Sequence, residues 1–198
     1  RQQLRQLPED VRIPARQVLD LEKQVVQRFR PMRDQRVAAL RCRHHGDYHL
    51  GQLLYTGRDF VIIDFEGEPL RSISERRIKR SPLRDVAGML RSFHYVSSAA
   101  LFGQVPGIVV EERMHDELRR WAHFWYLASS HSFLKGYLET TGSAPFLPKQ
   151  KDHQHILLDS YTLEKAMYKL GYELNNRPDW VRIPLQGILD LLGTGETK

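Results

Sequence analysis

Hydrophobic residues recur at helical spacing over most of this chain. After Pro14, which suits a first helical turn, the apolar positions are Leu19, Leu21, Val25, Val26 and Phe29. Pro31 and the charged residues up to Arg36 predict the end of this helix. Further amphipathic helices are expected over residues 84–101, about 109–138, 156–174 and 184–192, with a loop at 142–152 that contains two prolines.

One strand pair interrupts this helical pattern. Two short apolar runs, residues 53–55 and 60–63, flank a turn that contains Gly57, which predicts a β-hairpin. The segment that follows is irregular and basic, with Glu75 as its one acid; its cations are Arg71, Arg76, Arg77, Lys79, Arg80 and Arg84. The expected fold class is therefore mainly α with a small β-hairpin.

Composition narrows the class of protein. The chain has 198 residues, 41% of them hydrophobic, which excludes a disordered chain, and Cys42 is its one cysteine, which excludes a disulfide scaffold. No apolar run reaches the ~18 residues of a membrane helix. We expect a cytoplasmic protein, cut or processed because the chain does not begin with methionine. The net charge of +6 suits an anionic partner without identifying it.

Three polar residues around the hairpin stand in the order that phosphoryl transfer requires. Asp47 lies in a polar loop, Gln52 follows five residues later, and Asp64 ends the second strand. In such enzymes one carboxylate accepts the proton of the attacking hydroxyl, while an amide oxygen and a second carboxylate hold Mg²⁺ on the nucleotide phosphates. The hairpin would bring Asp64 back beside the Asp47 loop.

These motifs resemble a known family. Residues 45–52, His-Gly-Asp-Tyr-His-Leu-Gly-Gln, are similar to the catalytic loop of the aminoglycoside-phosphotransferase-like kinases, in which Asn is commoner than Gln52. Residues 62–69, Ile-Ile-Asp-Phe-Glu-Gly-Glu-Pro, resemble their metal-binding segment. Residues 79–93, 163–166 and 172–180 extend the resemblance to the bacterial maltokinases, which are often fused behind a trehalose synthase domain.

The resemblance implies an activity and a set of roles. It implies ATP-dependent phosphorylation of maltose to maltose 1-phosphate, on a route from trehalose to α-glucan such as glycogen. Asp47 would be the catalytic base, and Gln52 and Asp64 would bind Mg²⁺. Asp85 would hydrogen-bond the backbone of the catalytic loop, and His45 and His49 would support that loop.

The resemblance also implies an incomplete kinase. The whole chain, 1–198, would be the helical C-terminal lobe of a protein-kinase-like fold, with its acceptor-binding region at about 84–192. No glycine-rich strand pair or strand lysine precedes His45, so an ATP-covering N-terminal lobe is expected before Arg1 in the parent protein. We expect the isolated chain to fold without transferring phosphate, and a trehalose synthase domain is a possible neighbour in the parent polypeptide.

The acceptor sugar is expected near Asp47, against the helix that precedes Trp180. Aromatic rings beside charged groups are typical of sugar sites. The candidate contacts are Lys165, Tyr172, Glu173 and Arg177, with Tyr168, Asn176 and Trp180 close by in sequence. Alternatively, the tyrosines are core residues and Glu173 and Arg177 form an i,i+4 surface pair.

Other functions remain open on the residues alone. A metal-dependent hydrolase would use His45, His49 and Asp64 as ligands, although Gly46 argues against a helix that would align the two imidazoles. The basic segment at 71–84 is the one feature that suggests a nucleic-acid module, and a charge run is more often a solvated surface. A non-catalytic pseudokinase lobe is a third alternative. We expect neither a nucleic-acid nor a membrane partner.

Overall fold

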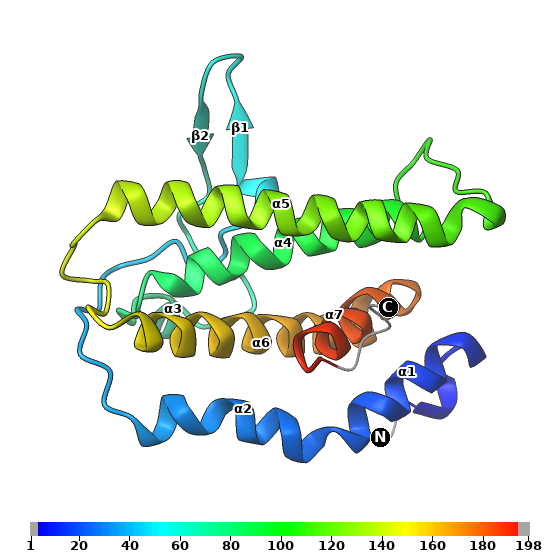
Figure 1. The fold of residues 1–198 in the computed structure, drawn as a ribbon, viewed down its shortest axis with the longest axis horizontal. Helices are drawn as coiled ribbons and strands as arrows, with labels where there is room; N and C mark the ends of the chain where they lie inside the picture. Colours follow the sequence, from blue (N-terminus) through cyan, green and yellow to red (C-terminus); the bar gives the residue numbers. More distant parts are fainter. Residues whose placement is uncertain (1–3, 194–198) are drawn as a thin grey trace.

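The computed structural model describes residues 4–193 and is mainly helical (Figure 1). The α-helices are α1 (Glu9–Asp20), α2 (Glu22–Asp34), α3 (Ile73–Arg76), α4 (Leu83–Leu101), α5 (His115–Thr141), α6 (Lys151–Asn176) and α7 (Arg182–Leu191). Strands β1 (Leu53–Tyr55) and β2 (Phe60–Ile62) form the predicted antiparallel hairpin, with Leu54 opposite Val61. None of the described helices combines the length and apolar character needed to cross a bilayer.

Helices α4 and α6 form the centre of the molecule and run in the same direction (Figure 1). Arg84, in the first turn of α4, bonds Glu164 near the middle of α6, and Tyr95 bonds Glu173 toward the C-terminal ends of the two helices. The hairpin projects from one side of this helical body, and α1 and α2 lie along the opposite side (Figure 1). The pair α4–α6 therefore has a catalytic-loop end, marked by Arg84 and Glu164, and a far end, marked by Tyr95 and Glu173.

Two apolar clusters hold the helices together. The first joins one face of α1 to α6 and α7, through Val11, Val18, Leu163, Ala166, Leu185 and Ile188 among others. The second joins the start of α4 to α6 and the 142–150 loop, through Leu83, Val86, Ala87, Leu147, Leu157 and Tyr161. Both clusters arise from apolar residues at helical spacing, as the sequence predicted.

The predicted boundaries of the first helix are wrong at both ends. Helix α1 begins at Glu9, so Pro14 lies inside it rather than in its first turn, and α2 continues through Pro31 to Asp34. A proline inside a helix removes one backbone hydrogen bond and crowds the preceding turn, which makes it a strong but not absolute break. Here the chain instead turns at Leu21, between the two helices.

The basic segment after the hairpin is less irregular than predicted. It contains the short helix α3, whose first turn is closed by a capping box: Ser72 accepts a hydrogen bond from the Glu75 amide, and Glu75 accepts one from the Ser72 amide. A single bridge pairs Cys42 with Arg80, so this segment returns to the strand-like residues before the catalytic loop.

Candidate active site

The predicted catalytic loop, residues 45–52, is held at its start by Asp85 of α4. One carboxylate oxygen of Asp85 accepts a hydrogen bond from the His45 amide at 2.6 Å, and the other accepts one from the Gly46 amide at 2.9 Å. Bonds from amides to a carboxylate are charge-assisted and therefore strong. The structure thus places Asp85 against the loop backbone, as the resemblance implied.

Two further residues of α4 hold the rest of this loop. The Oγ of Ser92 accepts a hydrogen bond from the Leu50 amide at 3.0 Å. A Cβ atom on Gly88 would lie 2.6 Å from the Tyr48 carbonyl oxygen, so only a glycine allows the helix and the loop to approach this closely. Gly88 and Ser92 stand three and seven residues after Asp85. The three residues therefore lie on one face of α4, and this face packs against the loop.

His45 connects the loop to the segment that carries Asp64. The imidazole is buried, and its Nε2–H donates to the Ile63 carbonyl oxygen over 2.8 Å. Its Nδ1 faces the Asp47 amide at 3.4 Å, which is a long hydrogen bond. His45 therefore fixes the distance between the residue before Asp64 and the residue that would act as base.

Asp47 lies near the imidazole of His49 and the lysines Lys165 and Lys169. The Nε2 of His49 is 3.7 Å from one Asp47 carboxylate oxygen, while the His49 Nδ1 accepts a hydrogen bond from the Gly51 amide. Partial burial raises the pKa of Asp47, but His49, Lys165 and Lys169 outweigh it and lower that pKa to about 2. Asp47 is therefore an ionised carboxylate at neutral pH, able to accept a hydrogen bond from a hydroxyl.

Gln52 and Asp64 converge at the base of the hairpin. The side-chain amide nitrogen of Gln52 donates to a carboxylate oxygen of Asp64 over 2.8 Å. The main-chain amide of Ile63 donates to the main-chain carbonyl oxygen of Gln52. Asp64 is exposed and has a φ of 62°, and no other described non-glycine residue has a positive φ. Such outliers occur disproportionately at functional sites. A carboxylate and an amide side by side offer the hard oxygen ligands that Mg²⁺ prefers.

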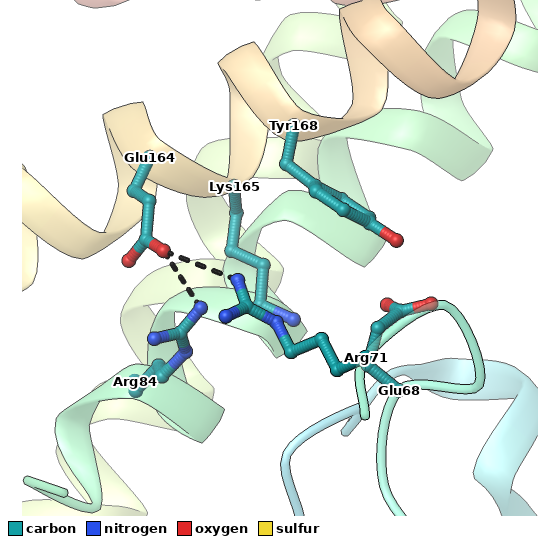
Figure 2. A pocket seen from close by; sticks show the side chains of 6 residues that line it. All are labelled: Glu68, Arg71, Arg84, Glu164, Lys165 and Tyr168. Carbon is teal, nitrogen blue, oxygen red and sulfur yellow. Dashed lines mark hydrogen bonds and ion pairs between the residues drawn. The ribbon is translucent and has the colours of Figure 1, made fainter. Parts of the chain in front are cut away.

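Lys165 links the catalytic loop to α6. Its side chain is 8% exposed, and its Nζ donates to the Gly46 carbonyl oxygen over 3.3 Å. Burial lowers the pKa of this lysine, and the nearby Asp47 carboxylate partly opposes that effect. Of the four sugar contacts predicted from sequence, Lys165 lies at the catalytic-loop end, in a polar pocket (Figure 2).

The other three predicted contacts lie together at the far end of α6. Glu173 is fully buried. Its carboxylate accepts two hydrogen bonds from the Arg177 guanidinium and one from the Tyr95 hydroxyl. Arg177 also stacks over Tyr172 and over Trp180, whose ring is parallel to that of Tyr95. Helix α6 rises 1.5 Å per residue, so about 10 Å of helix axis separates Tyr172 from Lys165.

The two histidines of the loop do not converge on one metal. His45 uses its ring nitrogens for the Ile63 carbonyl and the Asp47 amide, and His49 points one nitrogen at the Gly51 amide. Within residues 4–193, no group of three or more His, Cys, Asp or Glu side chains is arranged to hold a metal ion. This geometry gives the hydrolase alternative no support.

Sequence reasoning missed three residues of this region: Gly88, Ser92 and Glu68. The first two share the helical spacing of Asp85, which is a recognisable signal once Asp85 is known to face the loop. Glu68 lies in the 62–69 segment that carried the family resemblance, but its burial depends on the path of the chain around Gly67, which has a φ of 80°. No sequence pattern predicts that burial.

Comparison with known proteins finds similarity to glucosamine kinases. A scan against protein-family models finds no match. A glucosamine kinase of Mycolicibacterium smegmatis is 44% identical over 156 residues, which are 76% of this chain and 34% of that protein. A glucosamine kinase of Streptacidiphilus jiangxiensis is 26% identical over 148 residues, 75% of this chain and 31% of that protein. The chain spans about a third of the length of these curated relatives.

Solved structures share the fold. A glucosamine kinase in complex with glucosamine, ADP and inorganic phosphate matches with a TM-score of 0.75 at 21% identity, over 97% of this chain and 44% of that one. A second crystal form of a glucosamine kinase, form B, matches with a TM-score of 0.74 at 21% identity, over 96% of this chain and 42% of that one. The helical body and the single hairpin are therefore those of the C-terminal lobe of a protein-kinase-like fold.

Proposed function

We propose that this chain is the catalytic lobe of an ATP-dependent sugar kinase. The observation that carries the proposal is the assembly of the loop: Asp85 holds its backbone, Asp47 stands ionised within it, and the Gln52–Asp64 pair lies at its end. The curated relatives and the structural neighbours, all glucosamine kinases by name, support the same activity.

Each residue has a defined part in this proposal. The hydroxyl oxygen of the acceptor attacks the γ-phosphorus of ATP, the bond from that phosphorus to the β,γ-bridging oxygen breaks, and ADP leaves. Asp47 orients the hydroxyl and accepts its proton. Gln52 and Asp64 would hold Mg²⁺, which neutralises the developing phosphate charge. Asp85 and His45 keep the loop in place.

The acceptor has two candidates. Glucosamine is supported by the relative that shares 44% identity. Maltose, phosphorylated at its anomeric hydroxyl, is supported by the resemblance of residues 64–69, 79–93 and 172–180 to the maltokinases. The trehalose synthase domain and the route to α-glucan belong to the maltose alternative.

A separate ATP-covering lobe is part of the proposal. Phosphoryl transfer needs a cover over the nucleotide phosphates and a strand lysine, and the described elements include the two-stranded hairpin as their one sheet. We infer that the isolated 198 residues fold but do not consume ATP. Measurable turnover by the isolated chain would contradict this inference.

The test is sugar-dependent ATP consumption by the full-length polypeptide with Mg²⁺, using glucosamine, maltose, glucose and trehalose. Asp47→Asn keeps the size of the side chain and removes its charge, so kcat should fall by roughly 10²–10⁴-fold. Asp159→Asn, at an exposed position on α6, is the matched control and should retain full activity. Turnover that survives Asp47→Asn would remove Asp47 from the reaction, and no turnover with any sugar would favour a non-catalytic lobe.

A further inference from the structure

Helix α5 carries large apolar side chains on two faces, and they are covered to different extents. On the inner face, Phe133 and Tyr137 pack against the apolar cluster at the start of α4. On the outer face, Trp121 and Phe124 are 60% and 61% exposed, and their rings meet edge to face with centroids 6.0 Å apart. Exposed aromatic residues that gather in one place are typical of an interaction surface.

The outer face of α5 follows a regular spacing. From Met114, the residue before the helix, exposed side chains recur in alternating steps of three and four residues up to Leu138. This spacing places the side chains along one line of the helix, and it is the spacing by which two helices pack side by side. At 1.5 Å per residue the line is about 36 Å long. We call it the α5 seam; it follows the outer side of the helix that lies along α4 (Figure 1).

The order of charges along the seam fits a second copy of the same chain in the opposite direction. When Glu117 faces Lys135 of the second copy, two-fold symmetry makes Lys135 face Glu117 of the second copy as well. The Lys135 side chain is 64% exposed, and its contact with Glu139, at 4.0 Å, is a weak surface pair that leaves the ammonium available.

The apolar residues fit the same register. Phe124 lies opposite Ala128 of the second copy, so a large ring meets a small side chain, as helix packing requires. Met114 lies opposite Leu138 at each end of the pair. A parallel pair in register would instead set Glu117 against Glu117, and like charges across an interface oppose association. The antiparallel direction therefore satisfies charge and size together.

We propose that the α5 seam is a homodimer interface, in which two copies of the chain pack their α5 helices in opposite directions. The two-fold axis passes between Phe124 and Ala128. The pocket beside the catalytic loop is lined by residues of α4, α6 and the segment after the hairpin, so the dimer does not depend on the function proposed above.

Sedimentation velocity and light scattering of the full-length polypeptide, from about 1 to 100 μM, test the seam. The parent protein should form dimers in this range. Trp121→Ala and Phe124→Ala should each weaken dimerisation at least about tenfold, because each removes an aromatic ring from the centre of the interface. Asp159→Ala, at an exposed position on α6, is the control and should leave the dimer unchanged.

Charge reversal tests the direction of pairing. Glu117→Lys and Lys135→Glu each set like charges opposite one another in two places, and each should weaken dimerisation by about tenfold. The double variant restores opposite charges and should return the dissociation constant to within about threefold of the parent value. Far-UV circular dichroism of all three variants should match the parent protein, because both side chains are exposed.

Three results would overturn the proposal. The first is a parent protein that stays monomeric over the whole range; a lower melting temperature of Phe124→Ala in that monomer would mean that another part of the same polypeptide covers this face. The second is a dimer that Trp121→Ala and Phe124→Ala leave intact, which would place the interface elsewhere. The third is a double charge variant that remains as weak as the single variants, which would exclude the antiparallel register.

Discussion

Glu68 and Glu173 are both buried carboxylates in contact with the α4–α6 pair, yet their surroundings differ. Glu173, at the far end, accepts hydrogen bonds from Arg177 and Tyr95 and is fully buried. Glu68, at the catalytic-loop end, lines a polar pocket together with Arg71, Lys165 and Tyr168. Burial alone therefore does not identify a functional carboxylate; Glu173 is enclosed by its own hydrogen-bond partners, whereas Glu68 lies at a pocket.

The largest effect is expected on the free energy of unfolding when the buried Glu173 is replaced. Glu173→Ala leaves the Tyr95 hydroxyl and the Arg177 guanidinium without their partner, and the free energy of unfolding should fall by about 3 kcal/mol. Glu139→Ala breaks another i,i+4 glutamate pair, with Lys135 at 4.0 Å on the surface of α5, and should change stability by less than about 0.5 kcal/mol. Urea denaturation measures both. Equal losses would mean that burial does not distinguish the two pairs.

The free energy of unfolding should also depend on pH, through His94 at the far end of α4. Burial and the neighbouring Arg91 lower the pKa of His94 to about 4, despite the Asp190 carboxylate at 3.5 Å; His123 from α5 acts in the same direction as Arg91. Between pH 6.5 and 4 the unfolded chain binds a proton at this position that the folded protein does not. Stability should therefore decrease as the pH falls through that window, by on the order of 3 kcal/mol.

Denaturation curves at several pH values test this expectation. His94→Gln should flatten the dependence between pH 6.5 and 4, whereas His131→Gln, at an exposed position on α5, should leave it unchanged. The pKa values of Asp34, Asp47, Glu75 and Asp190 are also lowered in the folded protein. The stability that these carboxylates contribute is lost as the pH falls below their ordinary values, so their effect lies mainly at the acid edge of this window and below it. A slope that persists in His94→Gln would assign the acid sensitivity to another group.

A substitution at the catalytic-loop end of α4 should lower kcat. In Gly88→Ala the new methyl group would meet the Tyr48 carbonyl at 2.6 Å and push the loop away from α4. A displacement near 1 Å at a reacting group reduces kcat by about 100-fold. Gly171→Ala on α6 has open space around its Cβ position and should retain activity while gaining up to about 1 kcal/mol of stability. Full activity in Gly88→Ala would show that the loop is not held by this contact.

The smallest effect is expected at Ser92. Ser92→Ala leaves the Leu50 amide without its acceptor, which should lower kcat by roughly fivefold, or about 1 kcal/mol, with the KM for ATP unchanged. Ser97→Ala removes a hydroxyl that bonds the His94 carbonyl one turn further along and should leave kcat unchanged. Steady-state kinetics of the two variants measures the difference. The same kcat in Ser92→Ala and the parent protein would contradict a positioning role for Ser92.

The fold was largely predictable from the sequence. Apolar spacing predicted four of the helices. Two of them agree closely with α4 and α7, whereas α5 begins at His115 rather than at about residue 109, and α6 begins at Lys151 rather than at residue 156. Turn chemistry predicted the hairpin. The prolines at 14 and 31 were misleading, because each helix tolerates the loss of one hydrogen bond. The short helix α3 was missed even though Ser72 and Glu75 form a recognisable capping box.

The site was predictable only where residue chemistry is distinctive. The family pattern proposed Asp47, Gln52, Asp64 and Asp85. The structure joins Asp85 to the loop that carries Asp47 and joins Gln52 to Asp64, while the roles of these residues stay predictions. It also proposed Glu173, whose carboxylate accepts hydrogen bonds from the side chains of Tyr95 and Arg177. The state of a carboxylate's partners depends on tertiary packing between distant segments, which helical spacing does not encode.

The left-handed backbone at Asp64 restricts which amino acids this position can accept. Only glycine, asparagine and aspartate adopt such a conformation at little cost, and aspartate alone among them carries a charge. Conformation and chemistry thus point to the same residue for independent reasons. Alanine there would disturb the backbone and the charge together, whereas asparagine would change the charge alone.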